Sequence, residues 1–198
     1  MKNRFVTAVL IALPAALFAQ QPPAQPPTIA SEVGGQLSSA EREVLQVAEE
    51  MPEDRYGFAP TSGEFKGVRT FAAQVKHIAA EGYNICSTIK GEKPPADTNG
   101  DAGPANLTTK ADILKYARDS FAYCRQAFST INEKNALERI PGMGGRGQTT
   151  RLAMATFAAA HPFDHYGQMV VYLRMNGHIP PASQPRPPAG QARPPAGR

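Results

Sequence analysis

Apolar residues recur at the three- and four-residue spacing of helices in four segments of the chain, and almost no segment alternates as a strand does. The four segments are residues 38–50, residues 68–89, a stretch from 108 or 109 to a point before Pro141, and residues 148–176. Each segment can hide one apolar stripe against the others. We therefore expect an all-α fold, a four-helix bundle over residues 31–179.

Local signals mark several ends of these helices. Ser38 or Ser39 can cap the first, and Thr108 or Thr109 can cap the third. The fourth should stop at Gly177 because glycine tolerates the left-handed conformation that often follows a helix. The glycine-rich residues 141–147 lack the preceding strand and the lysine-hydroxyl pattern of a phosphate loop, so we interpret them as a flexible connection.

The first 19 residues have the features of a signal peptide. Lys2 and Arg4 precede an apolar run, residues 5–17, that is too short to span a bilayer stably, and Ala19 offers a small residue for cleavage. We expect an exported protein, periplasmic or secreted, with no stable membrane anchor after cleavage. The alternative is an anchor helix that is retained.

Proline-rich segments flank the expected domain. Residues 20–30 are rich in proline and glutamine and are typical of a linker. Residues 180–198 repeat a Pro-Pro-Ala-Gly theme with interspersed arginine and have little apolar surface to bury. We therefore expect a disordered tail there.

The basic balance of the whole chain comes from its ends. Lysine and arginine number 21 against 17 acidic residues, but the signal segment holds two of the basic residues and the tail holds three. The body thus carries 16 basic residues against 17 acidic ones. This near-neutral body argues against a nucleic-acid partner.

Two of the four histidines stand out by their spacing. His161 and His165 are four residues apart, so their imidazoles lie on one helix face, as in helices that present two imidazoles to one metal ion. The alternative is that the two histidines simply lie on a solvated or partly buried face of the helix. His77 lies off the apolar stripe of the second helix, so it is either exposed or faces a polar cleft. Pro162 should bend the fourth helix between the two histidines, which either opens the helix there or shifts these faces.

Three separated pieces of the chain resemble DinB-like proteins. They are the run from His161 through Gln168 to the prolines 180 and 181, the second-helix segment 71–79 around His77, and the loop segment 51–61. The pieces occur in the order that the family has, and the resemblance covers about residues 31–182. It implies a four-helix bundle with a divalent metal ion, often zinc or nickel, held by His77, His161 and His165.

The resemblance leaves the activity open. Some relatives are thiol-dependent transferases or isomerases, whereas the export signal and Pro162 depart from those intracellular enzymes. We carry two hypotheses: a metal-dependent hydrolase or thiol transferase acting on an unidentified small molecule, and a metal-binding or structural bundle without catalysis. Gln168, Asp164 and Glu81 are the candidates to assist chemistry. Gln168 could orient a ligand, or it could support the metal ligands from behind or lie on the surface. A homodimer is left open.

Cys86 and Cys124 are the only two cysteines of the chain and fall on the apolar stripes of the second and third helices. In an oxidising compartment they can form a disulfide between the helices. The alternative is two buried thiols that act as small hydrophobic groups. A site in which the cysteine thiolates bind a metal ion is the least favoured interpretation.

Overall fold

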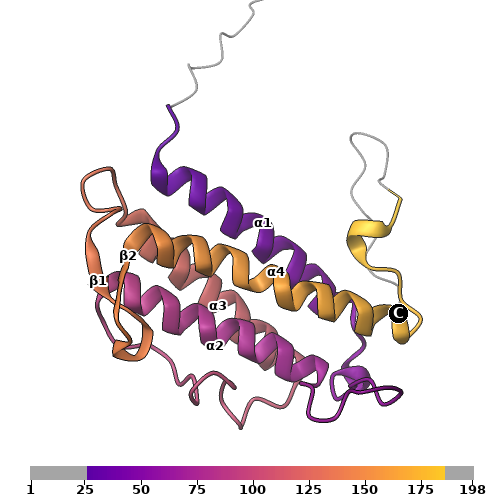
Figure 1. The fold of residues 1–198 in the computed structure, drawn as a ribbon. Helices are drawn as coiled ribbons and strands as arrows, with labels where there is room; N and C mark the ends of the chain where they lie inside the picture. The colour runs from indigo at the N-terminus through magenta and orange to yellow at the C-terminus, as the bar shows by residue number, and fades with distance from the viewer. Residues whose placement is uncertain (1–25, 186–198) are drawn as a thin grey trace, which may run out of the picture.

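The computed structural model describes residues 26–185 and consists mainly of four helices. The helices are α1 (Ile29–Glu50), α2 (Phe71–Lys90), α3 (Lys110–Ser129) and α4 (Arg151–Met175). Around the bundle, α4 packs between α1 and α2, and α3 packs against both of these on the other side (Figure 1). The predicted all-α four-helix bundle is confirmed. The predicted signal peptide and most of the linker lie outside the described residues.

Helix α1 begins at Ile29, nine residues before the predicted start. Thr28 caps it by accepting from the Ser31 N–H, and the Ser31 hydroxyl in turn accepts from the Thr28 N–H. Leu37 is buried and Val33 packs against the core, so tertiary contacts stabilise the first turns. Gly34 and Gly35 weaken this part of the helix because glycine loses the most conformational freedom there, but the reciprocal cap and the packing outweigh that cost.

The other three helices each begin after a threonine whose hydroxyl accepts from the backbone three residues on. Thr70, Thr109 and Thr150 are these caps, at 3.1–3.2 Å. The predicted start of the third helix is thus confirmed, and those of the second and fourth are wrong by about three residues. Helix α3 ends at Ser129, well before Pro141.

A short antiparallel hairpin precedes α4, and the sequence pattern did not predict it. Strands β1 (Arg139–Pro141) and β2 (Gln148–Thr150) pair so that Arg139 lies opposite Thr150. The glycine-rich connection closes the hairpin, since the Gly142 N–H donates to the Gly147 carbonyl at 3.1 Å. Figure 1 shows the hairpin at one end of the bundle, beside the start of α4. Three-residue strands are too short to give an alternating pattern.

The core lies between the four helices and is formed by aliphatic and aromatic side chains from all of them. The largest side chains that are almost fully buried include Phe71, Phe128, Leu37, Met51, Ile78 and Leu173. Met51 follows α1 directly, and the Tyr56 hydroxyl donates to the Ala48 carbonyl at 2.6 Å. These contacts fold the loop after α1 back onto the bundle. Among the described residues, no helix is both long and apolar enough to cross a membrane.

The expectation of a disordered tail from residue 180 is wrong for its first residues. Pro181–Ser183 form a 3-10 turn, Pro180 and Pro181 are buried, and the turn packs against α1. The Arg174 guanidinium also donates to the Ser183 hydroxyl at 2.9 Å. Proline is apolar and rigid, so it can pack at little cost in entropy. Residues 186–198 lie outside the described part of the chain.

Candidate metal centre

Three imidazoles from two helices meet between α2 and α4. His77 comes from α2, whereas His161 and His165 come from consecutive turns of α4. The ring centroids are 5.2 Å apart for His77 and His161, and 4.6 Å apart for each of the other two pairs. One nitrogen of each ring lies within 4.8 Å of the others. The structure therefore brings together the three histidines that the resemblance implied.

The nitrogen separations are close to those of a shared ion. Two nitrogens bound tetrahedrally at about 2.0–2.1 Å are about 3.3 Å apart. The Nε2 atoms of His161 and His165 are 3.1 Å apart. The pair already has the spacing of two ligands, and His77 needs a shift of at most about 1.5 Å to join them. Imidazole donors suit both zinc and nickel, so the donor set fits a divalent ion of this kind.

Burial favours the neutral form of His161 and His165. His77 and His165 are only 6% and 5% exposed, and His161 is half-buried. The pKa of His165 is lowered to about 4, mainly by burial and additionally by the neighbouring His161 and His77. Burial likewise lowers the pKa of His161, with His77 adding to the effect. A neutral imidazole has a lone pair for a metal, so little proton competition is expected at pH 7.

A backbone carbonyl determines which nitrogen of His77 faces the cluster. His77 Nδ1 lies 2.8 Å from the Asp101 carbonyl oxygen. Because a carbonyl can only accept, Nδ1 carries the hydrogen and Nε2 is left with the lone pair. The Asp101 carboxylate is 3.4 Å from the same Nδ1. Such a partner behind a histidine ligand fixes its ring and raises its basicity.

The loop that carries Asp101 is fastened to α2 beside His77. The Asn84 side chain donates to the Gly100 carbonyl at 2.7 Å, and Lys76 Nζ donates to the Pro104 carbonyl at 3.0 Å. Arg69 pairs with the Asp101 carboxylate at 3.1 Å. Gly103, whose φ is +73°, lies so close to Lys76 that a Cβ would come within 2.9 Å of its side chain. The contact of this loop with His77 was not predicted.

A buried glutamine, Gln74, fixes the ring of His165 through Nδ1, as Asp101 does for His77. His165 Nδ1 is 2.7 Å from Gln74 Oε1, and Gln74 Nε2 donates to Gln168 Oε1 at 2.7 Å. Gln168 was expected either to orient a ligand or to lie behind the metal ligands or on the surface, and in the structure it contacts Gln74, which lies between it and His165. Gln74 was not among the predicted site residues. The sequence did carry a signal for it, because Gln74 is a polar residue three positions before His77 in a largely apolar helix.

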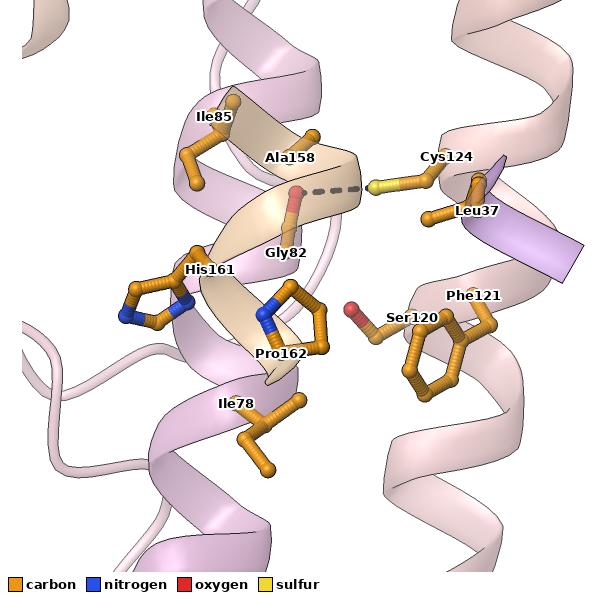
Figure 2. A pocket seen from close by; sticks show the side chains of 10 residues that line it. All are labelled: Leu37, Ile78, Gly82, Ile85, Ser120, Phe121, Cys124, Ala158, His161 and Pro162. Carbon is orange, nitrogen blue, oxygen red and sulfur yellow. Dashed lines mark hydrogen bonds between the residues drawn. The ribbon is translucent and has the colours of Figure 1, made fainter. Parts of the chain in front are cut away.

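Pro162 lies within α4, which continues through it without a break. Figure 2 shows the Pro162 ring turned toward Ser120 and Phe121 of α3, whereas the imidazole of His161 points away from them. Pro162 and His161 both line a small cavity that Cys124 and Gly82 also border. The proline therefore packs into the bundle while its neighbour joins the histidine cluster, and the two imidazoles of α4 still meet.

The cysteines stand beside the histidine cluster but outside it. Cys86 and Cys124 form a disulfide that links α2 to α3, with their Cα atoms 5.2 Å apart. Since both sulfurs are bonded to each other, neither is a thiolate ligand. His178 is also outside the cluster; it is half-buried, and its Nδ1 lies 3.8 Å from the Glu50 carboxylate.

Solvent reaches the cluster at His161, which is surrounded by both an aromatic ring and charged groups. The Phe157 ring is 44% exposed, with its centroid 5.5 Å from that of His161. Glu81 and Asp164 act on His161 as negative charges and Arg69 as a positive one. Asp164 is exposed, as expected, and Glu81 is half-buried with Oε1 3.0 Å from the Asn84 amide nitrogen.

Comparisons with known proteins show the family and the fold of this chain. The family model of the DinB superfamily matches residues 36–169. A DinB-like protein of Bacillus subtilis is similar in structure at 19% identity and a TM-score of 0.58, over 75% of this chain and 94% of that one. A DinB-like protein of Bacillus cereus ATCC 10987 is similar at 17% identity and a TM-score of 0.58, over 74% and 94%.

No curated protein is significantly similar in sequence. At identities below 20% the two solved structures show a shared fold and nothing finer. The family match covers most of the helical bundle and includes all three histidines of the cluster. This chain therefore belongs to the DinB superfamily.

Proposed function

We propose that this protein is exported and binds a divalent metal ion, zinc or nickel, through His77, His161 and His165, and that it acts as a metal-dependent hydrolase. The observation that carries the metal proposal is the convergence of three imidazoles, with one nitrogen of each ring within 4.8 Å of the others. His77 and His165 each have Nδ1 engaged by an oxygen acceptor behind the ring. Three nitrogen ligands leave a coordination position for water or substrate, as in catalytic zinc sites.

The chemistry is divided between the ion and the chain. When bound, the ion supplies a Lewis acid and lowers the pKa of water toward neutrality. Glu81 lies one helical turn after His77, so its carboxylate is on the same face of α2. Asn84 holds that carboxylate, and among the described residues no ion pair involves it. We assign Glu81 as the group that accepts a proton from the attacking water.

Export is supported by the signal-like residues 1–19 and by the Cys86–Cys124 disulfide, since disulfides persist in oxidising compartments. Low-molecular-weight thiols are scarce there, which favours a hydrolase over a thiol transferase. Fractionation of expressing cells tests export. The processed chain is expected outside the cytoplasm and should begin at Gln20.

Metal analysis of the purified mature protein tests the site. About one equivalent of metal is expected in the wild type, and His77→Ala and His161→Ala should each lose most of it because two histidines bind far more weakly than three. His178→Ala is the matched control, since it removes a histidine outside the cluster and should keep the metal. Equal, sub-stoichiometric metal in all four proteins would overturn the proposal.

The catalytic part is tested separately with Glu81→Gln. This change keeps the size of the side chain and removes its ability to take up a proton. The variant should keep its metal and lose on the order of 100-fold in hydrolysis of an activated ester. Unchanged hydrolysis would show that Glu81 does not accept the proton, and no hydrolysis in the wild type would favour a bundle that binds metal without catalysis.

A further inference from the structure

Gln74 is a buried amide in an otherwise apolar part of α2. It is 1% exposed, and its neighbours on the helix, Phe71, Val75 and Ile78, belong to the hydrophobic core. Burying an amide among such groups costs free energy unless both of its ends are hydrogen-bonded. Both ends of Gln74 are bonded, one to His165 and the other to Gln168. Its position therefore serves the polar contacts rather than the packing.

The orientation of this amide determines the tautomer of His165. With Oε1 toward the ring, as observed, Nδ1 must carry the hydrogen, and Nε2 has a lone pair directed at His161. With the amide reversed, the NH2 group would donate to Nδ1 and the ring hydrogen would move to Nε2. A protonated Nε2 cannot bind a metal ion. The same side chain thus permits or blocks the site according to which way it points.

The orientation of Gln74 is coupled to that of Gln168. Gln168 Oε1 accepts from Gln74 Nε2, so a reversed Gln74 would bring two oxygens together. Gln168 is exposed, and water can satisfy its remaining groups. Both amides must therefore reverse together, and an acceptor at position 168 keeps His165 able to bind metal.

We propose that Gln168 and Gln74 form a two-amide relay from the surface of α4 to His165, and that this relay sets the His165 tautomer and thereby the metal affinity. Both are positioning residues, and the affinity part of the proposal rests on the metal binding proposed above. The sharpest change is at position 168, since it lies on the surface and should not disturb folding. Gln168→Glu keeps an acceptor there, whereas Gln168→Lys offers only donors.

Two measurements on the full chain test the relay. In protein treated with chelator, ring ¹⁵N spectra should show the His165 hydrogen on Nδ1 in the wild type and in Gln168→Glu, and on Nε2 in Gln168→Lys. Zinc affinity, measured by competition with a chromophoric chelator, should fall on the order of 10- to 100-fold in Gln168→Lys only.

Val171→Lys and Val171→Glu are the charge controls, because Val171 is 51% exposed on the same helix and takes no part in the relay. If Gln168→Lys keeps the wild-type tautomer and matches Val171→Lys in zinc affinity, the relay is wrong. A wild type that binds no zinc would refute the metal site, and with it the affinity part. The tautomer spectra of the metal-free variants would still decide whether the two amides control His165.

Discussion

The burial of His165 should make the metal-free protein less stable as the pH falls from about 6.5 to about 4. In the unfolded chain a histidine takes up a proton near pH 6.5. In the folded protein burial lowers the pKa of His165 to about 4. Between these values the unfolded state binds a proton that the folded state does not bind, so the free energy of unfolding decreases as the pH decreases.

The size of this effect follows from the pKa difference. A difference of about 2.5 pH units, at 1.36 kcal/mol per unit, sets an upper limit of about 3 kcal/mol for His165. Below about pH 4 both states are protonated, so the contribution levels off. His161, whose pKa is also lowered by burial, should add to the loss in the same direction.

Urea unfolding of chelator-treated protein at a series of pH values measures this dependence. The variant His165→Gln will differ in stability at every pH, so the comparison concerns its slope with pH rather than its absolute value. Its slope between pH 6.5 and 4 should be clearly smaller than that of the wild type. Equal slopes for wild type and His165→Gln would refute the reasoning.

Two further predictions concern the contact between α2 and α3. A Cβ on Gly82 would overlap the Ser120 hydroxyl, so Gly82→Ala should lower the free energy of unfolding by about 1–3 kcal/mol. A double-mutant cycle in urea should show that Ser120→Ala relieves part of this cost, and strict additivity would contradict the predicted overlap. The Cys86–Cys124 disulfide closes a loop with a sequence separation of 38, so the chain-entropy model predicts that its removal by double alanine substitution costs about 4 kcal/mol. A loss below about 1 kcal/mol would show that the cross-link does not act through loop entropy.

The two parts of the proposed function depend on different residues. Metal binding rests on three histidines and on the groups behind them, which are defined by hydrogen bonds. Catalysis rests on Glu81, which no hydrogen bond connects to the cluster. A metal-loaded protein without hydrolytic activity would therefore separate the parts and leave the site intact as a binding site.

The fold was largely predictable because helix formation depends on local patterns. The helical periodicity of four segments and the cap at Thr109 were enough to predict a bundle. The start of α1 was not predictable, because Gly34 and Gly35 are weak helix formers and the packing of Leu37 and Val33 decides the matter. The hairpin before α4 was also missed, since its pairing depends on a contact across the glycine-rich turn.

The candidate metal site was likewise only partly predictable from the sequence. The spacing of His161 and His165 on one helix places their rings together, and this followed from the sequence alone. Whether His77 meets them depends on how α2 rotates against α4, which side-chain packing determines and local periodicity does not encode. The contacts of Gln74 with His165 and of Asp101 with His77 join residues that are 91 and 24 positions apart. The sequence by itself thus determined which residue types were available as ligands, and only the tertiary structure decided which nitrogen of His77 and of His165 faces the cluster.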